Sequence, residues 1–242
     1  MKRLPFAFFV CGLATHLCAG SIAILNPSFE DQTLSPGANS GSYPFGPITD
    51  WTESQTANVV YYAYYPSTVS YPSGVPDGVN VAGLTENGPS ANISQFLTAA
   101  LQANATYTFT GYAGLRADIH AWSPSLGCYG AGAVVEAGGN VLTPTPAGGD
   151  INCNTLSTGS FTEFTFVFST GADPAGLGDP LEIVLTANGS GSTSEAAEID
   201  FDKLSLTDTL GSGSGVPEPA TFGTMAAALA ICVLLLRRRT AV

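Results

Sequence analysis

Short stretches of this chain alternate apolar and polar residues with a period of two, which is the pattern of half-buried β-strands. Residues 106–110 place Tyr107 and Phe109 on one face, and the same alternation occurs at 164–168 and 181–186. Shorter candidates lie at 93–97 and 131–136. Clusters of Gly, Pro, Asn, Asp and Ser separate these runs, and no interior stretch has a convincing helical period. The pattern predicts an all-β sandwich or barrel.

The interior begins with residues 24–30, which read Ile-Leu-Asn-Pro-Ser-Phe-Glu and which we interpret as the first strand. About 20 residues later comes Trp51, which we expect to pack behind that strand.

The interior ends with residues 198–207, where the apolar phase changes. Ile199 and Phe201 share one face, and then Leu204 and Leu206 share it. One extra residue at Asp202–Lys203 would produce this change, so we predict a β-bulge there.

Both ends of the chain carry targeting features. Residues 1–20 have a basic start, an apolar stretch and small residues before a cut after Ala19 or Gly20, and so predict a signal peptide for the Sec translocon and signal peptidase. We divide the rest into a β-sandwich domain at 21–210, a Gly/Ser linker at 211–215 and a sorting segment at 216–242.

The sorting segment has three parts. Two prolines in Val216-Pro217-Glu218-Pro219 stop any preceding strand or helix, and 17 uncharged residues at 220–236 follow. As a helix these would reach about 25 Å, a minimal membrane span. Arg237, Arg238 and Arg239 would hold the far end at the cytoplasmic side.

This order of elements resembles the PEP-CTERM signal of Gram-negative bacteria; the alternative is a plain tail anchor. The resemblance implies cleavage by an exosortase-type membrane protease. It also implies export through the inner membrane, a transient anchor, and a final place at the cell surface or outside the cell.

The predicted domain is strongly acidic, with a charge near −16 from two basic residues, Arg116 and Lys203, and 18 acidic ones. Such a surface repels phosphate backbones, so we expect no nucleic-acid partner. The only cysteines inside the domain are Cys128 and Cys153, which we predict to form a disulfide in an oxidising compartment.

The opening Asn-Pro-Ser-Phe-Glu, a later Trp and the closing Ile-Asp-Phe-Asp-Lys-Leu-Ser-Leu-Thr resemble the galactose-binding-like jelly rolls, the fold of many carbohydrate-binding modules. In such domains the first and last strands often share a structural Ca²⁺. The resemblance places this ion at Glu30 and Asp202, with Asp200 as the alternate on the same face; the alternative is that all three are plain surface acids. Carboxylate oxygens suit calcium.

Tyr62, Tyr64, Tyr71 and Trp122 are the best candidates for an aromatic surface that contacts sugar rings, although alternate tyrosines of 61–65 would equally suit a strand packed in a core. Catalytic signals are weak, since the domain has one histidine, His120, and no Gly-x-Ser-x-Gly motif. We therefore expect no enzyme, but a non-catalytic surface or matrix protein associated with exopolysaccharide. The alternatives are a carbohydrate-binding module for external glycans and a secreted hydrolase.

Overall fold

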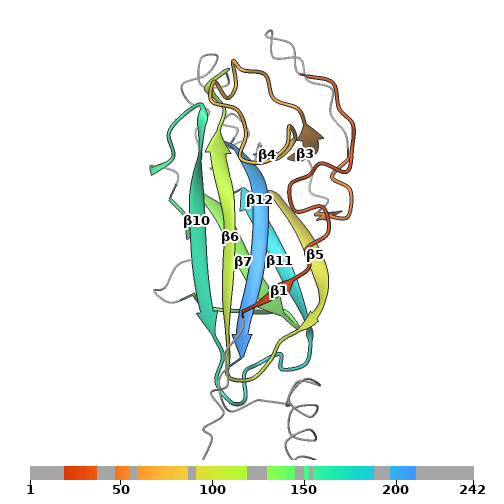
Figure 1. Cartoon of the computed structure of the whole chain (residues 1–242), viewed down its shortest axis with the longest axis vertical. Helices are drawn as coiled ribbons and strands as arrows, with labels where there is room; N and C mark the ends of the chain where they lie inside the picture. Colours follow the sequence, from red (N-terminus) through yellow and green to blue (C-terminus); the bar gives the residue numbers. More distant parts are fainter. Residues whose placement is uncertain are drawn as a thin grey trace, which may run out of the picture.

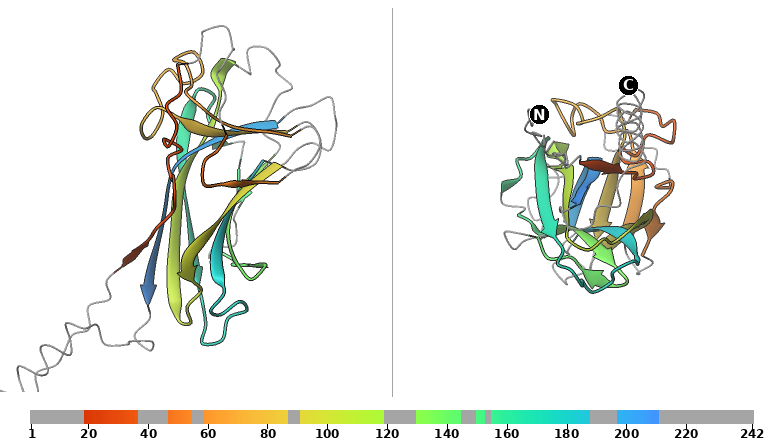
Figure 2. Two further views of the ribbon diagram at one scale, coloured as in Figure 1. Left: turned by 90° about the vertical axis from the view of Figure 1, so that its right-hand side faces the viewer. Right: turned by 60° about the horizontal axis from the view of Figure 1, so that its bottom comes forward.

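The structure, a computed structural model, is a sandwich of two antiparallel β-sheets (Figures 1 and 2). It describes residues 19–36, 47–54, 59–86, 91–118, 130–144, 150–152, 155–187 and 197–210. The first sheet has the order β10 (Ser160–Ser169), β6 (Ala105–Leu115), β12 (Ala197–Leu210), β4 (Val81–Glu86) and β3 (Val59–Tyr64), and β1 (Gly20–Ile22) also pairs with β12. The second sheet has the order β2 (Thr52–Glu53), β5 (Ala91–Ala100), β11 (Pro180–Ala187), β7 (Ala131–Ala137) and β8 (Asn140–Val141), and β9 (Asp150–Ile151) pairs with β7.

The main core lies between the two sheets and is built from alternate residues of their strands. In β6 the buried positions include Tyr107 and Phe109, and in β11 they are Leu181, Ile183, Leu185 and Ala187. Since alternate side chains of a strand point to opposite faces, these residues all reach the space between the sheets. The predicted all-β fold, a jelly-roll sandwich, is confirmed.

The predicted bulge in the last strand is also confirmed. The register of β12 against β6 shifts between Asp202 and Ser205, and Lys203 has a φ of 50°. Residues on both sides of this shift, Ile199 and Phe201 before it and Leu204 and Leu206 after it, are buried in the main core. Before the shift, Glu198, Asp200 and Asp202 alternate with Ile199 and Phe201, and they therefore face away from the main core.

The opening segment differs from the expected strand. The first strand is β1, and residues 24–30 form turns in which Asn26 and Phe29 have φ values of 46° and 60°. A strand needs negative φ values, and Pro27 has no N–H to donate to a ladder. Phe29 is nevertheless fully buried, and its ring lies 5.7 Å from that of Trp51, so the expected packing of Trp51 is confirmed.

A smaller apolar cluster lies on the outer face of the first sheet. It contains Tyr62, Tyr64 and Val81, with Val75 and Phe161 packed against it. The chain between β3 and β4 covers this face, and it is seen in orange at the top of Figure 1. The expected strand around Tyr62 and Tyr64 is therefore real, but its rings fill this outer cluster and not the main core.

Several predictions lie outside the described residues: the signal peptide up to residue 18, the disulfide of Cys128 and Cys153, Trp122, and the sorting segment at 216–242. Within the described ranges, no helix is long and apolar enough to cross a membrane. The sorting segment, its exosortase and the localisation stay predictions.

Candidate active site

Asp200 occupies a slot between two glycines on the outer face of the first sheet. In the sheet register it lies opposite Gly114 of β6 on one side and Gly83 of β4 on the other. Phe161 of β10 lies opposite Gly114, and Tyr62 of β3 lies opposite Gly83. A Cβ atom on Gly114 would lie 2.8 Å from the Phe161 ring, and one on Gly83 would lie 2.6 Å from the Tyr62 ring. Because neither glycine has a side chain, the rings of Tyr62 and Phe161 can lie over them, next to Asp200.

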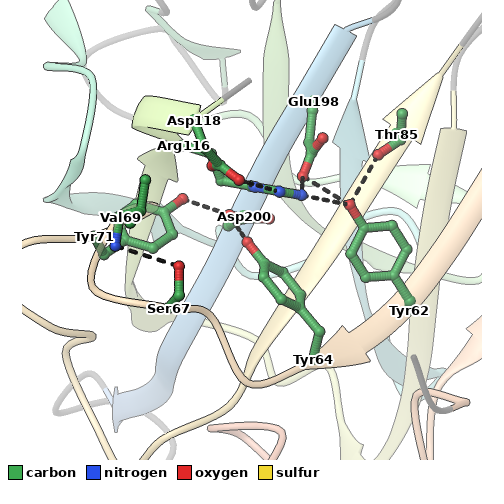
Figure 3. A network of polar contacts seen from close by, with 10 residues as sticks. All are labelled: Tyr62, Tyr64, Ser67, Val69, Tyr71, Thr85, Arg116, Asp118, Glu198 and Asp200. Carbon is green, nitrogen blue, oxygen red and sulfur yellow. Dashed lines mark hydrogen bonds and ion pairs between the residues drawn. The ribbon is translucent and has the colours of Figure 1, made fainter. Parts of the chain in front are cut away.

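Two tyrosine hydroxyls bind the same oxygen of Asp200. Tyr64 donates a hydrogen bond of 2.5 Å to Oδ2, and Tyr71 also donates a hydrogen bond to Oδ2 (Figure 3). The other oxygen, Oδ1, is buried and has no hydrogen-bond partner among the described residues. An unpartnered buried oxygen is unfavourable in a folded protein, and such atoms concentrate at sites with a function.

An ion cluster of Arg116, Asp118 and Glu198 lies beside this acid. The guanidinium of Arg116 donates to Asp118 Oδ2 at 2.7 Å and to Glu198 Oε1 at 2.9 Å (Figure 3). Tyr62 donates to the same Glu198 oxygen at 2.7 Å. Arg116 is only 7% exposed, because it follows directly on β6 and its guanidinium lies 5.3 Å from the centre of the Tyr64 ring. The cluster thus has one buried cation between two carboxylates.

These surroundings favour the neutral form of Asp200. Burial raises the pKa of Asp200 to about 8, the charge of Glu198 adds to this, and Arg116 and the two tyrosines oppose it. Burial and the nearby Asp200 also raise the pKa of Tyr64 and Tyr71 well above the usual range, so both remain hydrogen-bond donors. A neutral carboxyl group at neutral pH can donate a proton, which an ordinary aspartate cannot do.

A pocket of about 240 Å³ lies on the same face of the sheet, over β10 and β6. Its walls come from Tyr112 and Phe161 on the strands and from Val75 and Pro76 on the covering chain, together with Ser73, Gly74 and Ser160. The Phe161 ring is 4.4 Å from the ring of Tyr71, which binds Asp200. Phe161 therefore belongs both to the pocket wall and to the group of rings around the acid.

The structure separates the three acids that we expected to hold calcium. Asp200 belongs to the tyrosine cluster, whereas Glu30 and Asp202 both lie against the chain between β3 and β4. Glu30 accepts backbone N–H bonds from Val79 and Asn80, and Asp202 accepts one from Asp77. Among the described residues, no three His, Cys, Asp or Glu side chains are grouped to hold a metal ion.

The expected sugar-binding surface is not formed by the three tyrosines. Tyr62, Tyr64 and Tyr71 are 4%, 0% and 1% exposed, so they cannot present flat faces to a glycan. They instead surround Asp200 and the ion cluster, where their hydroxyls serve as donors.

Sequence reasoning missed Arg116, Glu198, Gly83, Gly114 and Phe161. One signal was present, since Arg116 is one of only two basic residues in a domain with 18 acidic ones. A lone cation in such a domain is a good candidate for a buried partner of carboxylates.

Two solved cyclase structures from Fischerella sp. TAU have this fold. The Stig cyclase Fisc, in complex with (3Z)-3-(1-methyl-2-pyrrolidinylidene)-3H-indole, is 23% identical, with a TM-score of 0.60 over 79% of this chain and 98% of that one. A cyclase in complex with 4-(1H-indol-3-yl)butan-2-one is 22% identical, with a TM-score of 0.61 over 79% and 99% of the two chains. No curated protein sequence matches the chain.

The decisive finding is a family model described as HpiC1 cyclase, which matches residues 20–207. This match covers most of the chain and nearly all of the sandwich. It overturns our expectation of a non-catalytic surface protein associated with exopolysaccharide, and with it the alternatives of a carbohydrate-binding module and a hydrolase. The chain belongs to the HpiC1-like cyclase family.

Proposed function

We propose that this protein is a cyclase in which neutral Asp200 donates the proton that begins ring closure. The observation that carries this proposal is a fully buried carboxyl group whose Oδ1 is free of any hydrogen bond within the described structure. Tyr64 and Tyr71 hold the other oxygen, so the proton of the neutral acid belongs on Oδ1. A positioned acid with a pKa near the working pH is the arrangement that general acid catalysis requires.

The reaction that we propose is an isomerisation in which a linear molecule becomes cyclic. The electron pair of a substrate carbon–carbon double bond takes the proton from Asp200 Oδ1, which leaves one carbon electron-poor. A second π bond of the same molecule supplies the electron pair for the new carbon–carbon bond. The ring system then loses a proton, and Asp200 recovers one, so the atoms and charge balance without any other reactant.

For the substrate, we propose a small unsaturated molecule that carries an aromatic ring. The indole compounds bound in the two Fischerella cyclase structures belong to this class. Here the apolar walls of the pocket, Val75, Pro76, Tyr112 and Phe161, suit such a ring because they offer flat faces and few polar atoms.

The test compares Asp200→Asn with the wild-type protein on a panel of unsaturated indole and phenyl compounds, with ring-closed products measured by mass spectrometry after chromatography. Asparagine keeps the shape but is no acid, so kcat should fall by at least about 100-fold. Asp173→Asn is the matched control, since Asp173 is exposed on a loop and should leave the rate unchanged. Equal product formation by Asp200→Asn would contradict the proposed role of this acid.

We also propose that Glu30 and Asp202 hold a structural Ca²⁺ together with oxygens of the chain between β3 and β4. The residues fit in two respects: Asn80 Oδ1 is buried without a hydrogen-bond partner in the described part of the chain, and burial raises the pKa of Asp202 to about 7, with Asp77 and Glu30 adding to this. Calcium would supply the positive charge that these carboxylates lack. Millimolar Ca²⁺ should then raise the melting temperature of the wild type but not of Glu30→Gln. An identical response of both proteins would exclude Glu30 as a ligand.

A further inference from the structure

Asp200 is enclosed on every side that the structure describes, so a substrate needs a path to it. Four aromatic rings surround the acid, and three of them are tied by hydroxyl groups. Tyr64 and Tyr71 bind Asp200 itself, and Tyr62 binds Glu198 and lies 3.2 Å from the Thr85 hydroxyl. The fourth ring, that of Phe161, has no hydroxyl group and is held by packing alone.

Phe161 is also the ring that faces the pocket. It forms part of the pocket wall, and its side chain fills the space that Gly114 leaves empty beside Asp200. Its strand, β10, is an edge strand of the first sheet, and among the described residues only the isolated bridge between Pro144 and Phe168 pairs on its outer side. If the ring turned away from Gly114, the pocket and the slot of Asp200 would become one space.

We propose that Phe161 is the specificity-determining wall of the site: the substrate occupies the pocket, and when the Phe161 ring moves aside, the substrate's reactive bond passes over Gly114 to reach Oδ1 of Asp200 on the Gly83 side. This inference rests on the proposed function, because it assigns the route to the acid that begins the reaction. The size of residue 161 then sets how large a group can approach Asp200. The side chains of Tyr112, Val75 and Pro76 accommodate the uncharged part of the substrate that remains in the pocket.

The opposite side of the slot provides a matched comparison. Tyr62 fills the space over Gly83 just as Phe161 fills the space over Gly114. The unpartnered Oδ1 of Asp200 lies on the Tyr62 side, where a Cβ on Gly83 would meet it at 3.0 Å, whereas Phe161 is the ring that borders the pocket. Removing either ring loosens the cluster, whereas only the removal of Phe161 should open the route.

The experiment uses dicyclohexylcarbodiimide, an apolar reagent that attacks neutral carboxyl groups in apolar surroundings. The carboxyl proton passes to a nitrogen of the reagent, and the carboxylate oxygen bonds to its central carbon. The rate of labelling at Asp200, measured by peptide mass spectrometry, therefore reports how often an apolar molecule reaches the acid. No knowledge of the natural substrate is needed.

Phe161→Ala should raise the labelling rate of Asp200 about tenfold, because the rate at an enclosed site follows the population of its open form. Phe161→Leu should raise it less, and Phe161→Trp should lower it below the wild-type rate. Tyr62→Leu is the control and should change the rate much less than Phe161→Ala. Melting temperatures identify any variant that has lost its fold. If Phe161→Ala does not fold, Phe161→Leu takes its place in the comparison of labelling rates.

Three results would overturn the inference: no change in labelling between the wild type and the Phe161 variants, an equal or larger increase in Tyr62→Leu, or no labelling of Asp200 in any variant. These results are independent of the proposed function, which fails instead if Asp200→Asn still closes rings. A route past Phe161 can thus be rejected while the acid role stands, and the reverse is equally possible.

Discussion

The two faces of β12 differ sharply at residues 198–202, before the bulge. The face toward the second sheet carries only apolar side chains, whereas the outer face carries the carboxyl groups of Glu198, Asp200 and Asp202 in alternate positions. The inner face is stabilised by removing apolar surface from water. The outer face buries carboxyl groups, which is unfavourable unless each has partners. The comparison teaches that the inner face supports the fold, while the outer face is retained for what its acids do.

The largest expected effect on stability tests the inner face. Phe109→Ala should lower the free energy of unfolding by about 3–5 kcal/mol, since Phe109 is fully buried and its removal leaves a cavity next to Phe164. Guanidinium chloride unfolding measures this value. Asp200→Asn, measured alongside, should be at least as stable as the wild type. A loss as large as that of Phe109→Ala would show that both faces serve the fold equally.

A second change tests the outer face by removing the positive charge of Arg116. Arg116→Met should lower the free energy of unfolding by about 3 kcal/mol, because Asp118 and Glu198 would lose the positive charge between them. The control is Lys203→Met, which removes the other basic residue of the domain from an exposed position and should cost less than about 0.5 kcal/mol. Similar losses in both variants would mean that net charge, and not the buried cluster, is responsible.

The pH dependence of the protein sharpens the comparison further. Since the proposed reaction requires the acid form of Asp200, kcat/KM should fall about tenfold per pH unit above pH 8. Stability has the same sign: between about pH 4 and pH 8 the folded chain holds a proton on Asp200 that the unfolded chain has released, so the free energy of unfolding decreases as the pH rises.

Asp200→Asn provides the control for both statements, because asparagine does not titrate. Its free energy of unfolding should decrease less than that of the wild type over the same pH range. Parallel pH profiles of stability in the two proteins would place the titrating group elsewhere on the outer face.

The smallest effect is expected from Tyr71→Phe, which removes one hydrogen bond to Asp200 and should cost about 1 kcal/mol. That hydrogen bond favours the charged carboxylate, so its loss should raise the pKa of Asp200 and move the fall in kcat/KM to higher pH. A shift toward lower pH would show that Tyr71 does not act through this bond.

Local patterns predicted the framework of the fold and part of its site. Alternation located several strands of each sheet but not β4, the phase change in β12 located the bulge, and the spacing of Asp200 and Asp202 placed both on one face. The partners of Asp200 could not be read in this way. Tyr71 and Tyr64 lie 129 and 136 residues away in the chain; the cross-strand register brings Tyr64 to the acid, and the covering chain between β3 and β4 brings Tyr71.

The function was misjudged for a related reason. The search for catalytic residues looked for known motifs and for exposed aromatic rings, but the acid owes its properties to burial and to neighbours from four strands and a covering segment. The turn at 24–30 was misjudged because its apolar and polar residues alternate as in a strand, while its positive φ angles depend on Asn26 and Phe29 fitting their tertiary surroundings.

Gly83 and Gly114 have a consequence for comparing this chain with others of its fold. A side chain at either position would displace the ring beside the acid, so under the proposed function the glycines are needed only while Asp200 acts on a substrate. A relative that has lost the reaction is free to replace them with residues that favour strands. The pair therefore serves as a marker in sequence surveys: chains that keep the aspartate and both glycines are candidates for the same chemistry, and chains that keep the aspartate alone are not.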